Sequence, residues 1–254
     1  LSQYTPSDRK TAGIDPQIAI DLMMEKYEQI KDVLYGFDYS DYIEGSASQR
    51  MDCIVRGVDF ILGKDEDDKK EFLNFVAEIG KAYALCSTSD KAQEINIEIS
   101  FFKAVKAGII KLLPKDKPKK TKDQIEYEIG QLVSKSVISE EVVDILATVG
   151  LNRPDISILS DEFLEEVKGL PQKNLALELL RRLLDGKIKA IAKKNVVQAK
   201  KFSEMLEASV NQYTKRSLET AEVIKALLSM AKDMNNLHKR GEELGLSDDE
   251  LAFY

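Results

Sequence analysis

The sequence of 254 residues has few of the amino acids that end or bend secondary structure. It contains 13 glycines and 6 prolines, whereas a β-sandwich or β-barrel needs many turn residues between its short strands. Its 43% hydrophobic and 32% charged residues, rich in Leu, Ile, Lys, Glu and Ala, favour helices around a sizeable core. We therefore predict an all-α fold, a multi-helix bundle with a long C-terminal helix or helix pair.

Cysteine and histidine are also scarce. The two cysteines, Cys53 and Cys86, lie in apolar helical patterns, which predicts buried, reduced thiols, although a disulfide stays open on sequence alone. The single histidine, His238, lies among polar residues near a predicted helix end. No serine motif accompanies it, so no catalytic triad is indicated. Two distant cysteines and one histidine do not indicate a zinc site either.

Long apolar runs are missing too. No run approaches the about 18–20 residues needed to cross a bilayer, and no signal peptide is visible, so we expect a cytoplasmic protein. The formal net charge of −7 argues against a free-standing nucleic-acid binder. The chain starts at Leu1, within a pattern, which suggests a piece of a larger protein.

Apolar residues recur at helical spacing along most of the chain. Pro16 begins the first predicted helix and Gly36 ends it. From residue 171 to about residue 244 the pattern is almost continuously helical, with a predicted break at Asp185 and Gly186. The other predicted helices cover residues 46–62, 67–86, 89–113, 122–135, 139–149 and 160–168.

Two further features bear on organisation. Phe37, Tyr39 and Tyr42 form an aromatic loop that we interpret as a lid on the core, with a partner-binding anchor as the alternative. Residues 111–122 contain two prolines and six lysines and form the clearest linker. We therefore predict an N-terminal helical subdomain (1–113), a Lys/Pro-rich linker (114–122) and a C-terminal helical subdomain (123–254).

One stretch resembles a phosphate-binding loop without matching it. It runs from Gly57 to Gly63, Lys64 and Asp65. The glycines are one residue too far apart, Asp65 replaces the hydroxyl residue, and apolar helix residues replace the small ones that a phosphate cradle needs. We predict no nucleotide site here.

A second stretch matches the PD…ExK pattern of metal-dependent nucleases, through Asp155, Glu166 and Lys168. In those enzymes the acids hold a divalent cation, and the E-x-K lies on a strand beside the aspartate. Here residues 161–168 have the pattern of an amphipathic helix, on which positions 166 and 168 point about 200° apart. We predict that this fragment has no catalytic residue, metal site or cofactor site.

Lysines provide the candidate contact surface. At about 100° per residue, five lysines between residues 189 and 201 fall within an arc of roughly 140°, opposite apolar residues such as Phe202 and Leu206. A solvated face, DNA phosphate and an acidic partner surface all fit this pattern. The candidate contacts are Lys189, Lys193, Lys194, Lys200 and Lys201, together with Lys115, Lys117, Lys119 and Lys120 of the linker.

Several long stretches resemble the C-terminal domain of type I restriction enzyme R subunits. They are GFDY (36–39), DISILSDEFL (155–164), LPQKNLALELLRRLL (170–184), AKKNVVQAKKFSEML (192–206), LETAEVI (218–224) and RGEELGLSDDELAFY (240–254). The resemblance covers most of the chain and is strongest from about residue 155. It rests on ordinary helix residues that are specific only together.

The resemblance implies a parent protein that cleaves DNA with an N-terminal nuclease domain and translocates it with ATP-driven motor domains, using ATP and Mg²⁺. This fragment lacks the motor motifs and a credible nuclease site. It is expected to dock the motor and nuclease domains of its own chain onto the modification (methyltransferase) and specificity subunits. Direct binding to the duplex DNA backbone and an unrelated helical scaffold are the alternatives.

Overall fold

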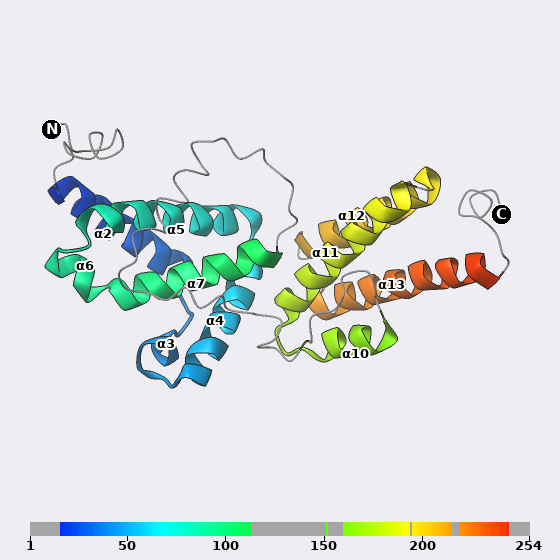
Figure 1. The fold of residues 1–254 in the computed structure, drawn as a ribbon, viewed down its shortest axis with the longest axis horizontal. Coiled ribbons are helices and arrows are strands. Elements are labelled where there is room, and N and C mark those ends of the chain that lie inside the picture. Colours follow the sequence, from blue (N-terminus) through cyan, green and yellow to red (C-terminus); the bar gives the residue numbers. More distant parts are fainter. Residues whose placement is uncertain (1–15, 113–150, 152–159, 194, 215–218, 244–254) are drawn as a thin grey trace, which may run out of the picture.

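The fold is all-α, as the sequence predicts. The computed structural model describes residues 16–112, 151, 160–193, 195–214 and 219–243, which contain ten helices and no strand (Figure 1). The helices are α2 (Pro16–Val33), α3 (Ser40–Glu44), α4 (Ala47–Leu62), α5 (Glu66–Cys86), α6 (Asp90–Glu94), α7 (Asn96–Leu112), α10 (Asp161–Gly169), α11 (Lys173–Ala192), α12 (Val196–Thr214) and α13 (Thr220–Glu243). None of the described helices combines the length and the apolar character that crossing a bilayer requires.

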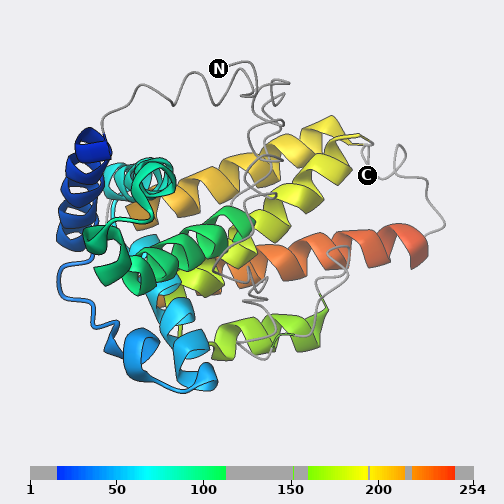
Figure 2. The same ribbon diagram turned by 60° about the vertical axis from the view of Figure 1, so that its left-hand side comes forward.

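The helices form two groups, α2–α7 and α10–α13 (Figures 1 and 2). In the first, α2 packs along α5, and α4 and α7 pack together. In the second, α11 packs on α12 and α13 and also reaches α4 and α7 of the first group. The buried apolar residues of both groups form one continuous cluster, so α11 connects the halves through a shared core.

Local signals explain most helix ends. Pro16 is the first helical residue of α2, and Gly36 has a φ of 87°, a left-handed conformation that glycine adopts without strain. Ser46 caps α4 through a capping box with Gln49. Asp65 accepts from the Asp68 N–H and so caps α5.

The aromatic loop is a lid, as predicted. Tyr39 stacks on Phe101 at 5.2 Å between ring centroids, and Tyr42 lies 5.1 Å from the same ring. Phe37 stacks on Phe101 at 6.0 Å and also meets Phe60 at 5.2 Å. Phe101 is fully buried beneath them, so these aromatic residues close the core of the first group.

The helix predicted over residues 89–113 is divided in two. Ser89 caps α6, and the chain leaves helical geometry at Ile95, with φ −106° and ψ 11°, before α7 begins. Ile95 is buried, so its packing position sets the bend more strongly than its local propensity does. The choice of helix over strand in this region is confirmed.

The predicted break at Asp185 and Gly186 is wrong, because α11 continues through both residues to Ala192. Leu183, Leu184 and Ile188 are buried on either side of the glycine, so core packing outweighs the about 1 kcal/mol that a glycine costs inside a helix. The break comes later, at Asn195, whose Oδ1 accepts the Gln198 N–H at 2.9 Å.

Several predicted features lie outside the described residues. They are the opening segment, the Lys/Pro-rich linker (114–122), the predicted helices at 122–135 and 139–149, and the final stretch from residue 244. The division into two subdomains at that linker therefore stays a prediction.

Candidate functional site

A carboxylate of the first group caps a helix of the second. Asp59 of α4 accepts the Leu175 backbone N–H on Oδ1 at 2.9 Å. Asn174 Nδ2 donates to the Asp59 carbonyl at 3.2 Å and lies 3.3 Å from Oδ2. Gln172, at the N-cap position of α11, makes no side-chain cap bond, so Asp59 takes this role from a different helix. Burial raises the pKa of Asp59, while its hydrogen bonds with Leu175 and Asn174 oppose that shift.

Tyr213 joins a third helix to this contact. Its hydroxyl lies 2.9 Å from Asn174 Oδ1 and 3.2 Å from the Leu62 carbonyl, so its proton is shared between two acceptors. Lys69 Nζ lies 6.0 Å from the centre of the tyrosine ring. The end of α12, the start of α11 and the α4–α5 turn are thus held together by side-chain hydrogen bonds.

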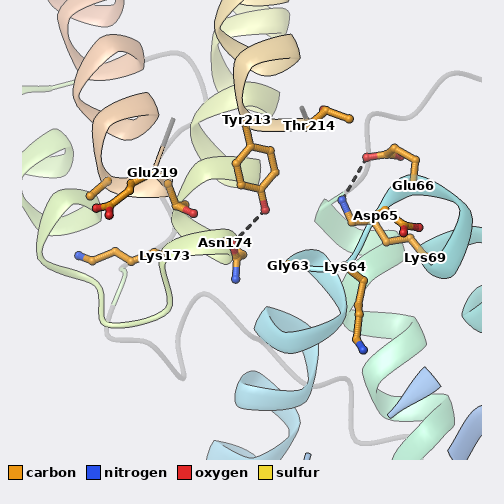
Figure 3. A pocket seen from close by; sticks show the side chains of 12 residues that line it. Gly63, Lys64, Asp65, Glu66, Lys69, Lys173, Asn174, Tyr213, Thr214 and Glu219 are labelled. Atoms are coloured by element: carbon orange, nitrogen blue, oxygen red, sulfur yellow. Dashed lines mark hydrogen bonds and ion pairs between the residues drawn. The ribbon is translucent and has the colours of Figure 1, made fainter. Parts of the chain in front are cut away.

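A pocket of about 640 Å³ lies at this junction. Figure 3 shows Lys64 and Lys69 on one wall, with Lys173 and Glu219 on the other. The lining carries three lysines and also three acids, and Lys69 pairs with Glu66 at 3.1 Å. Because the charges balance, the pocket has no excess positive charge for a phosphate or another anion.

The structure explains both glycines of the phosphate-loop resemblance by packing. A Cβ on Gly57, inside α4, would come within 2.9 Å of Val105 Cγ2. A Cβ on Gly63, at the end of that helix, would come within 2.8 Å of Asn174 Nδ2. Between them the chain is a continuous helix, so no loop of converging N–H groups is present in this stretch.

The PD…ExK match falls partly on described residues. Asp155 lies outside them, and Glu166 and Lys168 lie on α10. Lys168 pairs with Glu165 at 3.0 Å, and the intervening Val167 is buried. The predicted helix is confirmed, and it is an ordinary amphipathic one. Among the described residues, no group of three or more His, Cys, Asp or Glu side chains could hold a metal ion.

Both cysteines are buried and free, as predicted. The Cys86 thiol donates to the Ala82 carbonyl at 3.2 Å, and burial raises the pKa of both thiols. They therefore belong to the core. The side chain of His238 lies outside the described residues.

The five candidate lysines at residues 189–201 do not share one helix. The predicted arc of about 140° assumed a single helix, and that assumption is wrong. Lys189 lies on α11 and pairs with Asp185 at 2.8 Å. Lys193 follows the end of α11, and Lys200 and Lys201 lie on α12. The physical reason is the turn before Asn195, which reverses the chain between the two packed helices.

The structure still brings part of the set together. Lys193, Lys200 and Lys201 are exposed around the turn between α11 and α12. The opposite side of the same segment is buried, as predicted, through Phe202 and Leu206. Lys194 and the linker residues Lys115, Lys117, Lys119 and Lys120 lie outside the described residues.

Comparison with known proteins gives a consistent result. Residues 6–254 match the model of a protein family described as Type I restriction enzyme HindI endonuclease subunit-like, C-terminal. The chain is 32% identical over 254 residues to a Methanocaldococcus jannaschii protein named as the MjaIXP endonuclease subunit of a type I restriction enzyme, covering all of this chain and 24% of the relative. It is 35% identical over 190 residues to the type I restriction enzyme HindI endonuclease subunit of Haemophilus influenzae, covering 74% of this chain and 18% of the relative. The chain thus spans a quarter or less of the length of these relatives. No solved structure is significantly similar to it.

Proposed function

Because the chain belongs to the family of C-terminal regions of type I restriction enzyme endonuclease subunits, we propose that it is an assembly domain. In this proposal it docks the DNA-translocating and nuclease parts of its own protein onto the methyltransferase and specificity subunits. ATP and Mg²⁺ act elsewhere in the whole protein, and the complex works in the cytoplasm.

The exposed basic surface at the α11–α12 turn is the observation that carries this proposal. It lies on the end of the second group that points away from α2–α7 (Figure 1, yellow). By contrast, the polar side chains at the junction of the two groups bond to one another, through Asp59, Asn174 and Tyr213. The junction therefore serves the fold, whereas the described lysines of the turn are exposed.

The residues that resemble catalytic motifs have structural roles, and this supports a non-catalytic role for the chain. Gly57 and Gly63 are explained by helix packing, and Lys168 pairs with its neighbour Glu165. We propose that DNA cleavage by the whole subunit depends on residues outside this chain.

Co-elution tests the assembly role. The endonuclease subunit without residues 1–254 should fail to co-elute with the methyltransferase–specificity core, while the intact subunit co-elutes stoichiometrically. An intact motor in the truncated subunit, measured as DNA-stimulated ATP hydrolysis, is the control for folding. Stoichiometric co-elution of the truncated subunit would refute the proposal.

Direct binding to DNA phosphate is the second candidate, favoured by the exposure of Lys200, whose side chain is 77% accessible. Such binding would be independent of sequence and would weaken steeply as salt is raised. Replacing Lys193, Lys200 and Lys201 with Glu should then lower duplex affinity and flatten its salt dependence. Unchanged duplex binding by the assembled complex would exclude this candidate.

A further inference from the structure

Two adjacent valines stand exposed at the start of α12. Val196 is 72% accessible and Val197 is 76% accessible, although both are apolar. Valine is also a poor choice for an exposed helix position, because its branched Cβ restricts the side chain against the preceding turn. Neither helix formation nor core packing accounts for these two residues.

Lysines surround the valines. Lys200 follows Val196 by four residues and Lys201 follows Val197 by four, so each lysine lies one helical turn along the same face. Lys193 precedes the pair across the turn from α11 and is exposed. We call Lys193, Val196, Val197, Lys200 and Lys201 the Val–Lys patch.

The residues beside and beneath the patch are fixed by a helix cap and by core packing. Asn195 is 7% accessible, and its Oδ1 caps α12 by accepting the Gln198 N–H at 2.9 Å. On the other side of the helix, Phe202 and Leu206 are anchored in the core. The exposed valines are therefore held in position before any partner arrives, which reduces the entropy lost on binding.

We infer that the Val–Lys patch is a docking surface for a protein that presents carboxylates around a small apolar depression. This inference rests on the proposed assembly role, and it names the chemistry of the partner surface. An apolar centre with a charged surround is the usual arrangement of a protein–protein contact, in which the centre provides most of the affinity and the charges orient the partner. Charge complementarity selects an acidic partner, because the patch holds three lysines, and exposed Glu204, which lies 3.9 Å from Lys200, offsets one of them.

The valines argue for a protein partner and against DNA. Phosphate contacts come from lysine, arginine, polar side chains and backbone N–H groups, and they gain nothing from an exposed aliphatic side chain. A DNA-binding face would place polar or small residues where Val196 and Val197 lie. On a protein partner, burial of both valines adds affinity that salt does not screen.

The decisive experiment separates the apolar and the charged parts of the patch in the full-length endonuclease subunit. Val196→Ser/Val197→Ser should weaken binding to the purified methyltransferase–specificity core by about tenfold or more, equally at low and high salt. Lys200→Glu/Lys201→Glu should weaken binding most at low salt. The matched controls are Ile18→Ser on α2, which is 62% accessible, and Lys70→Glu on α5, whose side chain is 69% accessible; both should bind as the unmodified subunit does.

The outcomes distinguish this inference from the proposed function. If the valine variant binds the core like the unmodified subunit, the patch inference is wrong, although the deletion test can still support docking by another surface. If the lysine variant alone loses duplex affinity, the patch is a DNA contact. If the valine variant changes only self-association, measured by sedimentation, the occupant is a second copy of this chain. If the subunit without residues 1–254 still binds the core, both proposals fail.

Discussion

Asp59 links two parts of the chain that are far apart in sequence. Its carboxylate accepts the N–H of Leu175, 116 residues later, and so completes the first turn of α11. A side-chain cap of this kind contributes about 0.5–2 kcal/mol to stability. Because the cap comes from α4, its removal affects the contact between the two groups as well as the end of one helix.

We predict that Asp59→Ala lowers the free energy of unfolding of this chain by about 1–3 kcal/mol, measured by urea denaturation. The substitution removes the acceptor of the Leu175 N–H and one of the two acceptors of the Asn174 amide, whose bond to the backbone carbonyl of residue 59 remains. Asp59→Asn is the matched control, because its amide oxygen can still accept from Leu175, and it should lose less. Equal losses in the two variants would show that the cap is unimportant.

Among the described carboxylates, Glu178 is the one whose burial most clearly opposes folding. Its side chain is 9% accessible and lies 3.4 Å from Arg181, and its Oε1 atom has no hydrogen-bond partner. Burial raises the pKa of Glu178, with Arg181 opposing the shift. A carboxyl whose pKa is higher in the folded than in the unfolded state favours folding when protonated, and this contribution is lost as pH rises through the folded-state pKa.

Glu178→Gln should therefore make the chain more stable at neutral pH, by about 1 kcal/mol, because the amide carries no charge to desolvate. The advantage should shrink as pH falls toward about 4.3, the pKa of an unfolded glutamate. Urea denaturation over this pH range measures it. Glu165→Gln is the control with the opposite slope, because the hydrogen bond from Lys168 lowers the pKa of exposed Glu165. If the stability gained by Glu178→Gln did not vary with pH, desolvation of the charged carboxylate would not be its cause.

Little of this residue-scale detail could be predicted from the sequence. The burial of Cys53 and Cys86 and the aromatic lid follow from local patterns, and both are confirmed. Asp59, Asn174 and Tyr213 escaped prediction because they bond across long stretches of chain. Each has an ordinary residue type for an exposed helix position, so no local signal marks it.

At the scale of a helix, Gly186 tests the continuity of α11. A Cβ at this position would meet nothing within 4 Å. Inside a helix, alanine is more stable than glycine by about 0.5–1 kcal/mol, so Gly186→Ala should stabilise the chain by that amount in thermal or urea unfolding. If the chain turned at Gly186 instead, alanine would be neutral or harmful.

Gly57→Ala is the matched control, since Gly57 also lies inside a helix. There the added Cβ would come within 2.9 Å of Val105 Cγ2 and 3.0 Å of Phe101 Cζ. Overpacking of this kind costs about 1–3 kcal/mol, which exceeds the gain in helix propensity. The two glycine variants should therefore change stability in opposite directions.

The helices themselves were predictable, and their interruptions were not. Periodicity and caps identify α4, α5 and α10 to within a residue or two of their ends. The bend at Ile95 and the uninterrupted passage through Gly186 depend on what the rest of the molecule packs against those positions. Gly186 does not end the helix, because the cost of one glycine is small beside the burial of the leucines around it.

At the scale of the whole molecule, the lysine surface shows why the candidate site was only partly predictable. A helical projection places Lys189, Lys193, Lys194, Lys200 and Lys201 in one arc, but it assumes one helix. The turn at Asn195 divides them, and packing of α12 back on α11 brings Lys193, Lys200 and Lys201 around Val196 and Val197. No local pattern in the sequence marks the two valines as exposed, since their exposure depends on how α12 is oriented against the core.

The geometry of α10, together with the proposed function, leads to a prediction for the longer protein. Glu166 and Lys168 lie on a surface helix, and Lys168 pairs with Glu165 instead of facing Glu166. A metal-dependent nuclease needs its acids to converge on one cation and its lysine to reach the attacking water. The full-length subunit with Glu166→Ala and Lys168→Ala, assembled with its partner subunits, should therefore cleave DNA in the presence of Mg²⁺ and ATP at the unmodified rate. Loss of cleavage with normal assembly and ATP hydrolysis would show that these residues take part in the chemistry, and it would overturn the non-catalytic role proposed for the chain.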